Sequence, residues 1–159
     1  MKSEAYEQAL RFLAIRNHST AELKNKLVRK GYSAEEITDV LEDFTARGWL
    51  DDAELSRRVF ERYVEDGIYG NSYIAYKMEQ KGLTMPQRMS TAEELARAEA
   101  LVRQKLLRPG TILSKRKLAS FLANRGYGSG VVWGVMEALD DAVSLDSVPK
   151  KSYNGGRQS

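Results

Sequence analysis

The sequence of 159 residues carries a net charge of +3 and contains no cysteine and a single histidine. Disulfides, thiolate zinc sites and cysteine nucleophiles are therefore excluded, and a histidine-rich metal site or histidine relay cannot be built. No stretch approaches the roughly 20 apolar residues of a membrane span, and the N-terminal MKSEAYEQAL has acids where a signal peptide needs an apolar core. We expect a helix-rich cytoplasmic protein without membrane contact.

Three helices are expected in the first fifty residues. The first covers about residues 3–16, where apolar residues recur at three- and four-residue spacing. Ser19 with Glu22, and Ser33 with Glu36, each form a Ser-x-x-Glu capping box, in which side chains satisfy the free amides of a first helical turn. These boxes predict the starts of the second and third helices.

Further capping residues predict the helices that follow. Asp51 or Asp52 is placed to cap a fourth helix that runs to about residue 66. Asn71 or Ser72 can cap a short helix that ends at the next glycine. A longer helix is then expected from Thr91, which forms another capping box with its third neighbour, to about residue 107.

The second helices share one register, which reveals an internal repeat. Leucine, isoleucine or methionine stands eight and four residues before a glycine, a basic residue stands directly before it, and tyrosine or leucine directly after it. The equivalent residues are Leu23, Leu27, Lys30, Gly31 and Tyr32, then Ile74, Met78, Lys81, Gly82 and Leu83, then Leu118, Leu122, Arg125, Gly126 and Tyr127. The repeat predicts three similar helical units in series.

The expected fold is all-α, with tandem three-helix, helix-turn-helix-like repeats forming an elongated, curved array. The middle repeat has Pro86 where its third helix should lie, so that helix is expected to be shortened or lost. The predicted boundaries are 1–50 for the first repeat, 51–90 for the second, 91–143 for the third and 144–159 for a disordered tail.

The residues indicate binding and not catalysis. His18 is expected in a loop or near a helix cap, and most adjacent acid pairs fall at helix starts, where they suit capping. Tyr69, Tyr73 and Tyr76 stand close together; they could stack on a partner, but we favour a packing role. The two tryptophans, Trp49 and Trp133, are expected to fill interfaces between helices or units. We expect no enzymatic activity, metal or cofactor.

All of the excess positive charge lies in one block. Residues 100–136 contain seven Lys or Arg and no acid, which would attract a polyanion or an acidic protein face. A helix-turn-helix reader of base sequence fits poorly, because the helix after Gly31 is acidic and the helix after Gly126 lacks base-reading side chains. Contact with a nucleic-acid backbone or with a protein surface remains open.

Two stretches resemble the RecX family, the bacterial regulators of RecA recombinase: ALRFLAIRNHSTAELKNKLVRKGY and FTARGWLDDAELSRRVFERYVEDGIYGNSYIAYKMEQKGL. Residues 9–83 carry the resemblance most strongly, and residues 114–141 more loosely through LASFLANRGY. The resemblance implies a monomer without catalytic residues that binds along a RecA–DNA filament. It also implies that the protein restrains the filament's ATP hydrolysis, strand exchange and growth. This would give it a role in DNA repair, recombination and the SOS response. The chain departs from the family at Asn71, Ser72 and Tyr73, where a basic run is common.

Contacts are expected with RecA and with single- or double-stranded DNA, in which the cations would meet the phosphates of the backbone. An alternative is a nonspecific DNA-binding protein that acts without RecA. The candidate partner- and DNA-binding residues are the basic ones of the three repeats: Lys24, Arg29, Lys30, Lys77, Lys81, Lys115, Arg116, Lys117 and Arg125.

Overall fold

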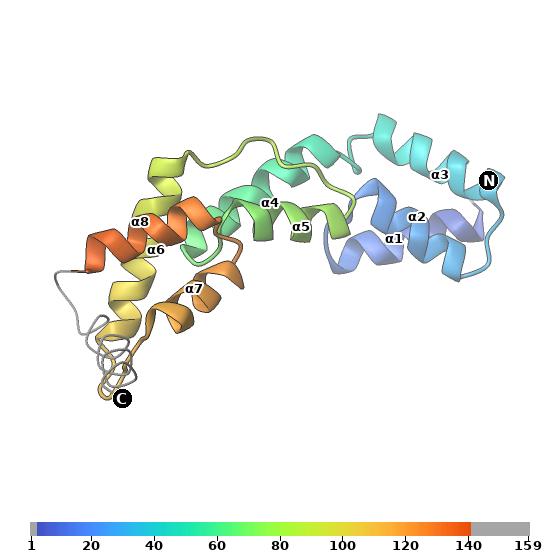
Figure 1. The fold of residues 1–159 in the computed structure, drawn as a ribbon. Coiled ribbons are helices and arrows are strands. Elements are labelled where there is room, and N and C mark those ends of the chain that lie inside the picture. The colour runs from blue at the N-terminus through green and yellow to red at the C-terminus, as the bar shows by residue number, and fades with distance from the viewer. Residues whose placement is uncertain (1–2, 141–159) are drawn as a thin grey trace, which may run out of the picture. The chain divides into compact units, whose positions relative to one another are not determined.

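The computed structural model describes residues 3–140, and these form eight α-helices without a strand (Figure 1). The predicted all-α fold class is therefore confirmed, whereas the tail predicted for 144–159 lies outside the described residues. The helices are α1 (Glu4–Ile15), α2 (Thr20–Arg29), α3 (Ala34–Ala46), α4 (Asp52–Asp66), α5 (Asn71–Gln80), α6 (Thr91–Leu106), α7 (Lys115–Ala123) and α8 (Ser129–Leu139).

The first two predicted capping boxes are present. The Ser19 hydroxyl accepts a hydrogen bond from the Glu22 amide at 3.0 Å, and the Glu22 carboxylate accepts one from the Ser19 amide at 3.0 Å. Ser33 and Glu36 make the same reciprocal pair at 3.1 Å for both bonds. Each box satisfies two amides that the helix itself leaves free, so the starts of α2 and α3 are fixed locally.

Helices α1, α2 and α3 enclose an apolar core. The Tyr6 and Phe44 rings meet edge-to-face, with centroids 5.1 Å apart, and the Trp49 ring meets Phe44 in the same way at 5.2 Å. Trp49 therefore packs partly against the core, as predicted for an interface residue, and keeps 45% of its surface exposed. The buried members of the core are Ala5, Tyr6, Ala9, Leu23, Leu27, Ile37, Val40, Phe44 and Leu50.

The predicted cap of α4 is present, whereas Asn71 makes a longer-range contact instead of capping α5. Asp51 does cap α4, since its carboxylate accepts from the Glu54 amide at 3.1 Å, while Asp52 accepts from the Thr20 amide at 2.9 Å. Asn71, in contrast, does not cap α5. Its side-chain amide donates to the Met89 carbonyl at 2.8 Å and accepts from the Met89 amide at 2.9 Å. A side-chain amide matches both backbone groups of a buried loop residue, which a cap would leave unpaired.

The cap of α6 is Ser90 and not Thr91. The Ser90 hydroxyl accepts from the Glu93 amide at 3.1 Å, whereas the Glu94 carboxylate accepts from the Asn71 amide at 2.8 Å. Glu94 is therefore taken up by the start of another helix and cannot complete the predicted box. No helix lies between α5 and α6, which agrees with the expectation that the middle repeat has lost its third helix.

Helices α6, α7 and α8 pack around a second core. Its buried members are Ala98, Val102, Leu113, Leu118, Leu122, Tyr127, Val131, Val132, Val135 and Leu139. The prediction that Trp133 fills an interface is wrong, because its side chain is 64% exposed on α8 while the valines beside it are buried. Helical periodicity places Val132 and Val135 inward and Trp133 outward.

The chain divides into two compact units. One takes in residues up to 61 together with 76–86, and the other takes in 62–75 together with the residues from 87 onward. The division falls inside α4 and α5, so each unit holds part of the middle repeat.

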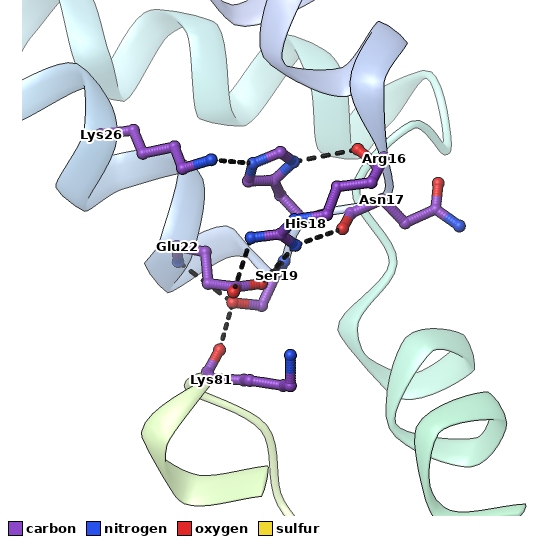
Figure 2. Close-up of polar contacts among 7 residues, drawn as sticks. All are labelled: Arg16, Asn17, His18, Ser19, Glu22, Lys26 and Lys81. Carbon is purple, nitrogen blue, oxygen red and sulfur yellow. Dashed lines mark hydrogen bonds and ion pairs between the residues drawn. The ribbon is translucent and has the colours of Figure 1, made fainter. Parts of the chain in front are cut away.

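Within the first unit, the turn Lys81–Gly82–Leu83 docks on the start of α2. The Ser19 hydroxyl donates a hydrogen bond to the Lys81 carbonyl (Figure 2). A Cβ atom added to Gly82 would lie 2.5 Å from the Cβ of Ala21, and Gly82 also has a φ of +74°. Only glycine fits both the left-handed backbone and this close approach.

Within the second unit, the turn Arg125–Gly126–Tyr127 docks in the same way on the start of α5. The Gly70 amide donates to the Arg125 carbonyl at 2.8 Å, and the Ser72 amide donates to the Gly126 carbonyl at 3.3 Å. A Cβ atom on Gly126 would lie 2.5 Å from the Cβ of Tyr73. The sequence repeat therefore corresponds to a repeated contact, in which the end of one second helix meets the start of the preceding one.

The glycines allow a matched test of this contact. Gly31→Ala should cost about 1–2 kcal/mol, because its φ of +91° is left-handed but a Cβ would meet nothing within 4 Å. Gly126→Ala should cost about 1–3 kcal/mol more, because the new methyl must also displace Tyr73. Urea unfolding of the two variants and the wild-type protein measures both losses, and equal losses would contradict the docking role of Gly126.

Candidate functional site

His18 is buried in the loop between α1 and α2, where it joins the two helices (Figure 2). Its Nδ1 lies 3.0 Å from the Arg16 carbonyl oxygen, and its Nε2 lies 2.7 Å from Nζ of Lys26. The carbonyl can only accept and the ammonium can only donate, so His18 is neutral, with its proton on Nδ1. The predicted loop position of His18 directly before the cap Ser19 is confirmed.

Burial lowers the pKa of His18 below its usual value of 6.5, and the charges of Arg16 and Lys26 lower it further. The carbonyl hydrogen bond and the Glu22 carboxylate oppose these effects without cancelling them. Glu22 behaves differently: burial raises its pKa, but hydrogen bonds from Ser19 and Arg16 and the charges of Arg16 and Lys81 lower it overall. The loop thus holds a neutral histidine beside an ionised carboxylate at neutral pH.

The candidate cations of the first unit lie on separate parts of its surface. Lys24 lines an apolar groove between α2 and α3, whereas Arg29 and Lys30 are exposed at the end of α2. Lys77 and Lys81 are half-buried, and the carbonyl of Lys81 is engaged by Ser19.

The first turn of α7 is entirely basic. Lys115, Arg116 and Lys117 are exposed there, at the end of the helix where the backbone dipole is positive and acids would be favourable. Nζ of Lys115 lies 3.8 Å from the carboxylate of Asp140. The dipole of α7 does not favour three cations at this end, and Asp140 offers a carboxylate to one of them.

The same positive surface continues along α7 to Phe121 and Arg125. Lys117, Phe121 and Arg125 follow one another at four-residue spacing, which places them on one face of the helix. The Arg125 guanidinium lies 3.8 Å from the Phe121 ring centroid, and Nζ of Lys105 lies 4.8 Å from it. These cation–π contacts hold two cations beside a shallow pocket.

The pocket brings in basic residues absent from the predicted site. Lys105 and Arg108 line it with Phe121 and Arg125, and no salt bridge within residues 3–140 neutralises these three cations. The acid-free composition of residues 100–136 was the sequence signal for both, but it gave no reason to prefer them over other cations. Their selection depends on how the end of α6 meets α7.

The tyrosines of the middle repeat pack on one another. The Tyr69 and Tyr73 rings are stacked at 3.8 Å, and each meets the ring of Tyr63 edge-on. Tyr63 was not foreseen as a member of this group, whereas Tyr76 is 58% exposed and its hydroxyl accepts from the Gln80 side chain at 2.9 Å. The packing interpretation holds for Tyr69 and Tyr73.

Two classes of site are not observed in the described part of the chain. Residues 3–140 contain no group of three His, Asp or Glu residues able to hold a metal ion. None of the described helices is long and apolar enough to cross a membrane.

Comparison with known proteins identifies relatives over most of the chain. A family model described as "RecX, first three-helix domain" matches residues 5–44. The chain is 34% identical to "Regulatory protein RecX" of Pelodictyon phaeoclathratiforme over 125 residues, covering 75% of this chain and 78% of that protein. It is 33% identical to "Regulatory protein RecX" of Leptothrix cholodnii over 139 residues, covering 84% and 87%.

The fold also matches a solved structure. The crystal structure of RecX from Lactobacillus salivarius superposes with a TM-score of 0.72 at 14% identity, over 86% of this chain and 95% of that one. The all-α fold and these relatives place the chain in a class of helical regulatory proteins. The chain belongs to the RecX family.

The lowered pKa of His18 makes stability depend on pH in a defined window. The unfolded chain takes up a proton near pH 6.5 and the folded chain only at lower pH, so stability should fall as pH decreases through 6.5. The effect of Glu22 belongs to the range below its unfolded value of 4.5.

His18→Gln should remove this dependence, because the chain has no other histidine. Urea unfolding midpoints at about pH 7.5 and 5.5 check it, since a histidine titrates within that range. We expect the wild-type midpoint to fall and the variant midpoint to change much less. A flat wild-type profile would rule out a buried neutral His18.

Proposed function

We propose that this protein regulates RecA recombinase by binding the RecA–DNA filament and restraining its ATP hydrolysis, strand exchange and growth. Membership of a family of regulatory proteins carries the proposal. It is supported by the positive surface of α7, where Lys115, Arg116 and Lys117 are exposed and held at a helix end that does not need them.

The physical route is a sum of weak contacts. We interpret the chain as three repeats (1–50, 51–90 and 91–143), each of which presents cations to a filament made of repeating protomers and phosphates. Linked contacts act at high effective concentration once the first has formed, so single contacts of modest strength can give firm binding. In this scheme the nine basic residues named from the sequence contact RecA or DNA, and Lys105 and Arg108 extend the set.

A monomer in the cytoplasm is the form in which we propose that it acts. The second candidate function, nonspecific DNA binding without RecA, is supported by the same acid-free block, since phosphate binding needs only positive charge. The two functions differ in whether RecA itself responds.

The first test is the DNA-dependent ATP hydrolysis of RecA. Adding the purified protein at up to equimolar amounts should slow hydrolysis by filaments assembled on single-stranded DNA, because the bound regulator restrains filament turnover. A coupled ATPase assay measures the rate, and strand exchange is followed in parallel. If both rates are unchanged while the protein still binds bare DNA, the second candidate function replaces the first.

The α7 cations give a second, quantitative test. The variant with Lys115, Arg116 and Lys117 changed to Gln should bind DNA less tightly and with a weaker salt dependence. Each lost phosphate contact removes about 0.7–0.9 from the slope of log affinity against log salt, so the slope should fall by about 2 to 3. Fluorescence anisotropy over a salt series measures it.

A matched control removes the same charge elsewhere. Arg11, Arg62 and Arg88 are also exposed, and none of them belongs to the candidate site. Changing these three to Gln should leave most of the slope intact. Equal losses for both triple variants would show that only net charge matters and that α7 has no special place in binding.

A further inference from the structure

The three glycine turns of the repeat have the same backbone conformation but different surroundings. The φ angles are +91° at Gly31, +74° at Gly82 and +86° at Gly126. Gly82 and Gly126 are each closely packed against the start of another helix, and a Cβ atom on Gly31 would meet nothing within 4 Å. The first repeat therefore presents, to the outside, the turn that the other two repeats use for docking.

The two docked turns define what such a turn binds. In both, a backbone carbonyl of the turn accepts from the start of a helix: Lys81 from the Ser19 hydroxyl, and Arg125 from the Gly70 amide. The receiving helix closely approaches the glycine in both cases, through Ala21 opposite Gly82 and through Tyr73 opposite Gly126. The carbonyls at the end of one repeat's second helix thus meet donors at the start of the preceding repeat's second helix, which aligns the two helix dipoles favourably.

A carboxylate accompanies both contacts. The charge of Lys81 helps to keep Glu22 ionised at the start of α2. At the other junction, the Glu94 carboxylate accepts from the Asn71 amide and would lie 2.9 Å from a Cβ on Gly70. A carboxylate thus stands at each receiving helix end, supplied by Glu22 of α2 itself and by Glu94 of α6.

We propose that the turn Lys30–Gly31–Tyr32 docks on the N-terminus of an α-helix in the partner protein. That helix begins with a serine, threonine or glycine and has a carboxylate near Lys30. The geometry of the docking mode comes from the two internal copies, while the choice of the filament protein RecA as the partner rests on the proposed function.

A second copy of this chain does not suit the turn. The equivalent receiving end of the third repeat is the start of α7, where the first turn holds Lys115, Arg116 and Lys117 and no acid. Arg29 and Lys30 are exposed beside the free turn, so two copies would bring like charges together. The charges favour a foreign helix with an acidic start.

Gly31→Asn tests the proposal without unfolding the protein. Asparagine tolerates the left-handed conformation, and the free turn has space for its side chain. When the turn docks, however, the asparagine side chain would clash with the partner helix, as a Cβ atom on Gly82 or Gly126 would clash with Ala21 or Tyr73. We expect binding to RecA filaments to weaken by about tenfold or more, as overpacking of at least ~1.4 kcal/mol implies. Surface-bound filaments with a dilution series of the variant give the affinity.

Gly48→Asn is the matched control. Gly48 also follows a helix of the first unit, has a φ of +78° and has nothing within 4 Å of an added Cβ. Gly48→Asn should bind filaments as the wild-type protein does. Both variants should unfold at nearly the wild-type urea midpoint, because asparagine in the left-handed conformation costs little stability. Equal binding by Gly31→Asn and the wild-type protein overturns the docking inference alone, whereas failure of the wild-type protein to bind overturns the proposed function.

Cross-linking locates the contact directly. The chain has no cysteine, so Arg29→Cys can carry a single benzophenone photo-cross-linker beside the turn, and Asp39→Cys can carry it on the exposed face of α3. With RecA filaments, the label at residue 29 should attach to the first turn of a RecA helix, and the label at 39 should attach there much less. Attachment to DNA, to a strand or helix interior of RecA, or to α7 of a second copy overturns the proposal.

Discussion

The contact between a glycine turn and the start of the preceding repeat's second helix underlies this architecture. Lys81 and Arg125 each offer a backbone carbonyl to donors that a helix leaves free, at Ser19 and at Gly70. A short helix buries little surface by itself, so satisfying both of its ends through a neighbour stabilises two elements with one contact. The glycine is required because the two backbones approach more closely than any side chain permits.

The same constraint separates what this family of folds must keep from what it can vary. A docked turn needs glycine and a free backbone carbonyl, but neither requirement concerns the outward faces of the helices. Charge is therefore free to differ between repeats, and it does: the start of α2 carries Glu22, whereas the start of α7 carries three cations. Regulation by surface contacts can evolve on such a frame without disturbing the core.

Sequence patterns predicted the local features and missed the longer-range ones. The capping boxes at Ser19 and Ser33 depend on residues three apart, so they could be read directly. The Asn71 side chain was assigned to a cap because its partner, Met89, stands eighteen residues away, and no local pattern reports that pairing. For the candidate site, charge indicated the α7 surface, but the cation–π contacts of Phe121 that add Lys105 depend on helix packing.

The two tryptophans give the molecule an optical consequence. Trp49 belongs to the first compact unit and is partly covered by Phe44, while Trp133 belongs to the second and is 64% exposed. An indole in water emits at longer wavelength than one against a ring, and soluble quenchers reach it more readily. Trp133→Phe leaves Trp49 as the single tryptophan, in the first unit, and Trp49→Phe leaves Trp133 as the single tryptophan, in the second. The fluorescence spectrum of the remaining tryptophan then reports on the folding of its own unit alone. No dye has to be attached to the surface that meets a partner.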